Sequence, residues 1–176
     1  DVFENGVAWV VIGLSLFCAN NLLMQREHRH VTLHLAAFFV ALAFNISGEV
    51  VELFFENPGE SQLVFIYSLL VFPANFVLAP LFWLYVRALT FEGKPTPAKY
   101  KLLHALPALV GVILVIGLWN LPLSALVIVQ GGDGDLQGWP LVLMTAIQLL
   151  SVSMEIQIAG YLLATVWLLK KYDELI

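Results

Sequence analysis

The stretch QLVFIYSLLVFPANFVLAPLFWLYVR, from Gln62 to Arg87, decides the fold because it carries no charge before its final arginine. At a rise of about 1.5 Å per residue, a helix of this length spans the roughly 30 Å hydrocarbon core of a bilayer. The stretch also contains Pro73, Pro80 and the amide of Asn75. Each proline removes a backbone hydrogen bond and favours a kink, so we expect Pro73 and Pro80 to act as hinges. The stretch is therefore predicted to be a membrane span with a polar interior, not a plain anchor.

The composition of the whole chain agrees with this prediction. Hydrophobic residues make up 60% of the 176 residues and charged residues only 12%. Soluble domains carry about 25% charged residues, so this composition indicates an integral membrane protein. The single cysteine, Cys18, falls inside an apolar run and provides neither a disulfide framework nor a cysteine metal site.

Five apolar runs alternate with polar connections, which predicts an all-α integral membrane bundle of five transmembrane helices. The expected spans are residues 6–24, 31–55, 62–87, 102–119 and 139–169. Residues 121–129 are apolar but too short to cross, and we interpret them as an interfacial segment bent at Pro122. Residues 1–176 thus form one transmembrane domain in this interpretation.

The positions of the charges predict how the bundle is oriented. All eight Lys and Arg residues fall in the first loop, the third loop or the C-terminal tail, which alternating spans place on one side. The positive-inside rule makes that side cytoplasmic. The opposite side receives only acidic charges, from Asp1, Glu4, Glu56, Glu60, Asp133 and Asp135. We therefore expect a multi-pass protein of the bacterial inner membrane, with its N-terminus outside and its C-terminus in the cytoplasm.

Polar side chains deep in the spans are the candidate site residues, because an ionisable group in lipid costs about 3 kcal/mol on insertion scales. Glu155 lies near the middle of the fifth run, with Gln148 and Ser151 seven and four residues before it on the same helical face. The set predicted to line a ligand-binding or signalling cavity, open to the outside, is Asn45, Glu49, Asn75, Gln148, Ser151 and Glu155. In the alternative interpretation, these groups pair with one another and hold the helices together.

Small residues on the last span suggest a close helix contact. Gly160 and Ala164 are four residues apart, a spacing that lets the backbones of two helices approach each other. This pair is interpreted either as the seam of a homodimer or as a packing site inside one bundle.

Two histidines lie near the cytoplasmic edge on different spans. His34 and His104 share a depth at which two imidazoles can ligate a b-type haem. The simpler interpretation makes both of them interfacial side chains beside the basic loops, and we expect neither a cofactor nor a metal site.

Several short motifs resemble those of a known family. The run APLFWLYVR at residues 79–87 is followed by a basic loop and then by HALP at residues 104–107. This order resembles the membrane-embedded N-terminal region of membrane-bound AraC-type transcriptional regulators. There, a Gly-Pro-Leu, aromatic, Tyr, basic run precedes a basic loop and a His-x-x-Pro entry to the next span. Ala79 replaces the glycine here, and Gln157 and Tyr161 are similar to the family's Gln and Tyr on the last span. The resemblance covers most of the chain.

The resemblance implies a function in signalling. It implies that a cytoplasmic helix-turn-helix domain, which binds DNA, follows residue 176. The present chain is then the sensor that relays an envelope signal or an unknown small ligand through the last helix. A different class is a small transporter or an intramembrane enzyme that uses Glu155 and Glu49 as proton or cation sites. The sequence contains no catalytic motif, so we do not expect an enzyme.

Overall fold

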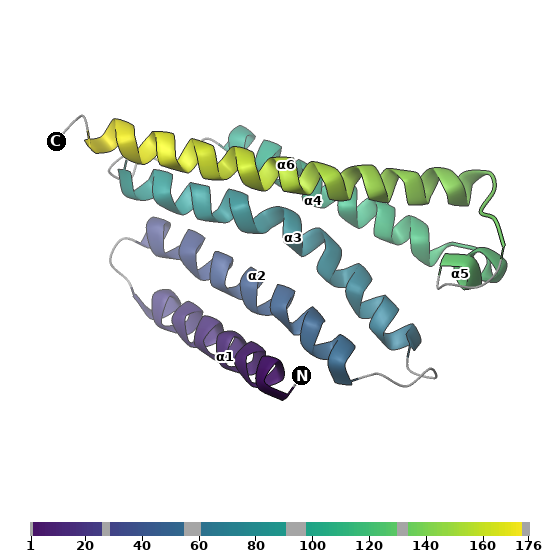
Figure 1. Ribbon diagram of the computed structural model, residues 1–176. Helices are drawn as coiled ribbons and strands as arrows, with labels where there is room; N and C mark the ends of the chain where they lie inside the picture. Colours follow the sequence, from purple (N-terminus) through teal and green to yellow (C-terminus); the bar gives the residue numbers. More distant parts are fainter. Residues whose placement is uncertain (1, 26–28, 55–60, 91–97, 130–133, 174–176) are drawn as a thin grey trace.

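The computed structural model describes residues 2–25, 29–54, 61–90, 98–129 and 134–173 (Figure 1). These residues form α1 (Val2–Met24), α2 (Arg29–Phe54), α3 (Ser61–Thr90), α4 (Ala98–Trp119), α5 (Leu123–Val129) and α6 (Trp139–Asp173). In this described part, five helices are long and apolar enough to cross a membrane. They match the five predicted spans one for one, so the prediction of an all-α chain with five such helices is confirmed.

The helix ends differ from the predicted spans by a few residues. The helix α3 continues past Arg87 to Thr90, and α6 continues past Leu169 to Asp173. Apolarity marks the hydrocarbon core, whereas a helix can continue into the interface because long basic side chains reach out to water. The segment after Pro122 forms the separate short helix α5, in keeping with a stretch too short to cross.

The central helix of the bundle is α3. It packs against α2 on one side and against α4 and α6 on the other, while α1 packs against α2. Figure 1 shows this order, with α1, α2 and α3 following one another and α4 and α6 lying beyond α3. The start of α1 and the end of α6 lie at opposite ends of the bundle.

Two prolines lie inside α3, and the helix continues through both of them. Figure 1 shows that α3 bends along its length, which is the expected effect of internal prolines. Neighbouring helices approach α3 closely at glycines. A Cβ atom on Gly48 of α2 would lie 3.3 Å from a methyl group of Val71, and one on Gly111 of α4 would lie 3.5 Å from the Cα atom of Pro73.

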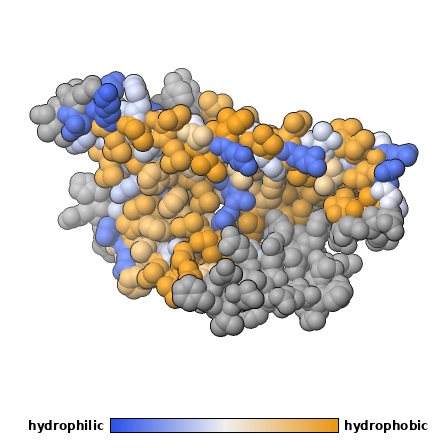
Figure 2. Space-filling view, in the orientation of Figure 1, coloured by the Kyte–Doolittle hydropathy of each residue, from blue (hydrophilic) through white to orange (hydrophobic). Residues whose placement is uncertain are grey.

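The surface of the bundle is apolar. Leu149, Ile156 and Leu163 of α6 are 67%, 69% and 72% exposed. Figure 2 shows hydrophobic residues over much of the described surface, with hydrophilic ones at both ends and in a few patches between them. Monomeric soluble proteins rarely expose large continuous apolar patches, because water disfavours them. The surface is therefore compatible with a multi-pass membrane protein.

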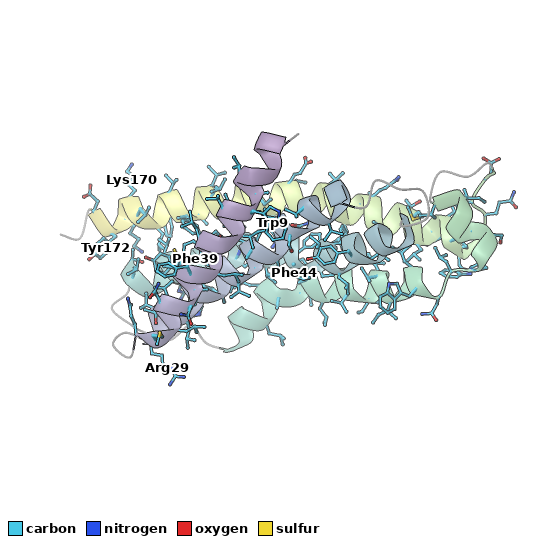
Figure 3. The ribbon with its side chains drawn as sticks, turned by 90° about the horizontal axis from the view of Figure 1, so that it is seen from below. Trp9, Arg29, Phe39, Phe44, Lys170 and Tyr172 are labelled. Carbon is cyan, nitrogen blue, oxygen red and sulfur yellow. The ribbon has the colours of Figure 1, made fainter. Side chains whose placement is uncertain are left out.

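Basic residues gather at one end of the bundle. Arg29 begins α2, Arg87 lies in the last turn of α3, and Lys170 and Lys171 lie in the last turn of α6. Figure 3 places Arg29, Lys170 and Tyr172 toward the same end. Other charges used in the orientation argument lie outside the described residues: Asp1, Arg26, Glu56, Glu60, Lys94 and Asp133.

Candidate functional site

A proline in α3 leaves one backbone carbonyl without its helical hydrogen bond, and a side chain of α6 donates to that carbonyl. Pro80 has no N–H group, so the carbonyl of Phe76, four residues earlier, loses its helical hydrogen bond. The side-chain amide of Gln157 on α6 donates to this carbonyl at 3.1 Å. Phe76 is only 1% exposed, so its carbonyl has little access to other partners. The contact thus removes a penalty of about 1–3 kcal/mol for an unpaired buried acceptor.

One turn further along α6, a second polar contact reaches α4. The hydroxyl of Tyr161 and Nδ1 of His104 form a hydrogen bond. The two rings lie edge to face, with their centroids 5.5 Å apart. The ring of Trp83 on α3 lies 5.0 Å from His104 and 6.1 Å from Tyr161, between centroids. Three helices therefore meet in one cluster of aromatic rings.

A cation adjoins this cluster. The guanidinium carbon of Arg87 lies 5.2 Å from the centre of the Trp83 ring, within the range of a cation–π interaction. Arg87 belongs to the basic end of the bundle, so the cluster lies close to the end at which α6 terminates. We call the following five residues the α3–α4–α6 junction: Trp83, Arg87, His104, Gln157 and Tyr161.

The junction joins α6 to α3 and α4 through two hydrogen bonds. His104 and Tyr161 bond each other, and Gln157 bonds a backbone carbonyl. One turn beyond Tyr161, the hydroxyl of Thr165 is buried and has no hydrogen-bond partner among the described residues. A buried hydroxyl without a partner is rare in proteins, so Thr165 stands apart from the paired groups of the junction.

The structure distributes the predicted cavity residues over different surroundings. Asn45 on α2 and Asn75 on α3 are half-buried, whereas Gln148 and Glu155 on α6 are exposed. The hydroxyl of Ser151 donates to the carbonyl of Ile147 in its own helix, at 3.0 Å. The side chain of Glu49 lies outside the described residues. The cavity predicted to include Asn45, Asn75, Gln148 and Glu155 stays a prediction.

The small residues proposed for a dimer seam differ in their exposure. Gly160 is exposed, and a Cβ atom added there would meet nothing within 4 Å. Ala164 is half-buried. The homodimer through this pair stays a prediction.

The two histidines considered for haem lie on helices separated by α3. His34 belongs to α2, which packs against α1 and α3, whereas His104 belongs to α4 and bonds Tyr161 of α6. Haem ligation by this pair stays a hypothesis. Among the described residues, no group of three or more His, Cys, Asp or Glu side chains is placed to hold a metal ion.

Comparisons with protein-family models, with curated proteins and with solved structures find no match to this chain.

Proposed function

We propose that this chain is the membrane sensor and signal-input domain of a bacterial membrane-bound transcriptional regulator of the AraC type. The observation that carries the proposal is the α3–α4–α6 junction. Its members come from the separate sequence segments in which the resemblance to that family lies. Trp83 and Arg87 belong to the run at residues 79–87, His104 begins HALP, and Gln157 and Tyr161 lie on the last span. Four of these residues thus share one cluster, and Gln157 bonds α3 one turn away on the same helix as Tyr161, which supports a common function for them.

In this proposal, α6 is the output element. It is the last helix described, and Lys170 and Lys171 lie in its last turn, at the end of the bundle toward which Arg29 also lies. By the positive-inside rule, this basic end faces the cytoplasm of a bacterial cell. The DNA-binding domain implied by the resemblance follows residue 176 on that side, so a movement of α6 reaches it directly.

A signal requires two arrangements of the bundle that bind the stimulus with different affinity. Gln157 and Tyr161 hold α6 in the arrangement described here, through hydrogen bonds worth roughly 1 kcal/mol each. Breaking these contacts is within the typical coupling energy of about 1–3 kcal/mol for an allosteric ligand. In the second arrangement, α6 shifts against α3 and α4, and the unpaired hydroxyl of Thr165 gains a partner. Pro73 and Pro80 lie inside α3, and they are the points at which the bend of this helix can change.

The test is the transcript profile of cells that carry the full-length gene with single changes. Deleting the gene is expected to alter a defined set of transcripts, and Tyr161→Phe is expected to alter the same set because it releases α6 from His104. Leu163→Ala is the control, since Leu163 is 72% exposed on the same helix. It should leave the profile unchanged.

Two results would contradict the proposed function. The first is an unchanged profile in the Tyr161→Phe strain despite normal insertion of the protein. The second is uptake of a cation by the purified 176-residue chain in lipid vesicles, which would favour a small transporter instead.

A further inference from the structure

The outward face of α6 carries a continuous heptad pattern. Its positions follow spacings of four and three in alternation from Leu141 to Leu169. The first set of positions, which corresponds to a in a heptad, holds Thr145, Val152, Ala159 and Val166. The second set, which corresponds to d, holds Leu141, Gln148, Glu155, Leu162 and Leu169. All nine side chains are exposed. We call these nine positions the α6 seam.

Two polar side chains in this seam lie in an apolar surrounding. Gln148 and Glu155 are exposed on a helix whose neighbouring surface is aliphatic: Val152 is 57% exposed and Leu162 54%. Figure 2 shows hydrophilic residues interrupting the hydrophobic surface along α6. No hydrogen bond or ion pair within the described part of the chain includes either residue. A carboxyl group that faces hydrocarbon is costly, so a polar partner would stabilise the seam.

We propose that the α6 seam binds the same seam of a second copy of this chain, forming a parallel two-stranded coiled coil within the membrane. Copies inserted with one topology present their α6 helices in parallel, so each seam residue meets the same residue of the other copy. The seam is complementary to itself in this arrangement. An amide both donates and accepts, so Gln148 pairs with Gln148 of the second copy. Two Glu155 carboxyl groups can share one proton in a hydrogen bond.

The apolar seam residues favour the same partner. β-Branched residues at a with leucine at d favour parallel dimers. Val152 and Val166 occupy a, and Leu162 and Leu169 occupy d. Ala159 lies between Glu155 and Leu162 in the seam, where a small side chain lets the two helices approach closely. The opposite face of α6 is already taken by α3 and α4, so the seam is free for a second copy.

This interface differs from one built on Gly160 and Ala164. Gly160 follows Ala159 directly and therefore lies roughly 100° around the helix from it. Ala164 turns toward the bundle, where it is half-buried. The α6 seam does not depend on the proposed sensor function, since a transporter can also dimerise. If both proposals hold, the dimer brings two output domains together.

Disulfide crosslinking in native membranes tests the seam residue by residue. Single cysteines are introduced at Ala159→Cys and Leu162→Cys in a Cys18→Ala background, which removes the one native thiol. The matched controls are Gly160→Cys and Ser153→Cys, exposed positions on the same helix but outside the seam. We expect crosslinked dimers at the two seam positions and at neither control. Three results would overturn the proposal. They are stronger crosslinking at Gly160→Cys than at the seam positions, equal crosslinking at all four positions, and no crosslinking at any of them.

The pairing of Glu155 across the α6 seam is tested by measuring the dissociation constant of the dimer. The measurement uses energy transfer between labelled copies of the full chain in lipid vesicles. Glu155→Leu is expected to weaken the dimer roughly tenfold, because an interhelical hydrogen bond is worth about 1–2 kcal/mol in model peptides. Glu155→Gln keeps a donor and an acceptor and should dimerise like the unaltered chain. Ser153→Leu adds the same leucine outside the seam and should have no effect. Equal dissociation constants for Glu155→Leu and the unaltered chain would contradict pairing through Glu155.

Discussion

The two faces of α6 carry similar polar side chains in opposite surroundings. On the inner face, the amide of Gln157 and the hydroxyl of Tyr161 each bond another helix of the same chain. On the outer face, the amide of Gln148 and the carboxyl of Glu155 are exposed among aliphatic residues. In lipid, a polar group must find its partner in protein, and the face on which it lies decides whether that partner is in the same chain.

The strongest test of this comparison makes one chemical change on each face. Gln157→Leu is expected to lower the free energy of unfolding by about 2 kcal/mol, because the Phe76 carbonyl freed by Pro80 is left unpaired. The measurement is equilibrium unfolding in mixed detergent micelles, at concentrations at which the chain is monomeric. Gln148→Leu is the control, since Gln148 is exposed and should change this free energy little. Equal losses in the two variants would remove the distinction between the faces.

A smaller effect is expected at the contact with α4. Tyr161→Phe removes the hydroxyl that bonds His104 but keeps the ring beside Trp83. The free energy of unfolding should fall by about 1 kcal/mol, the size of one interhelical hydrogen bond. Tyr172→Phe makes the same change at an exposed position near the end of α6 and should be neutral. A loss of the same size in both variants would argue against the bond to His104.

The third change should stabilise the protein. The hydroxyl of Thr165 is buried without a partner among the described residues, so Thr165→Val replaces an unpaired polar atom by a methyl group of similar size. The free energy of unfolding is expected to rise by up to about 1 kcal/mol. Thr145→Val alters an exposed threonine whose hydroxyl bonds the carbonyl of Leu141, and it should not raise the stability. A destabilised Thr165→Val variant would show that this hydroxyl has a partner.

The five spans were predictable from sequence because apolarity is a local property that each run displays by itself. The spacing of Gln148 and Glu155 likewise placed both on one face of the last span. Sequence could not say whether that face turns inward, because this depends on which side of α6 packs against α3. The predicted common cavity with Asn45 and Asn75 assumed an inward face, whereas Gln148 and Glu155 are exposed in the single chain.

The junction was only partly visible in the sequence. Pro80 signals a free carbonyl four residues earlier, so an acceptor at Phe76 could have been inferred from the helix alone. The donor lies 81 positions further along the chain, and only the packing of α6 on α3 identifies Gln157. The sequence indicated that His104 lies near one end of its span. It could not identify Tyr161 as the partner, because that contact depends on how α6 packs against α4.

We propose that contacts on its inner face hold α6 in place and that its release produces the signal. The measurement is a double-mutant cycle on His104 and Tyr161 in the full-length protein, with the transcripts altered by gene deletion as the readout. If the two residues act through one bond, His104→Ala, Tyr161→Phe and the double variant change these transcripts to the same extent. Additive changes, or unaltered transcripts in all three variants, would contradict the account.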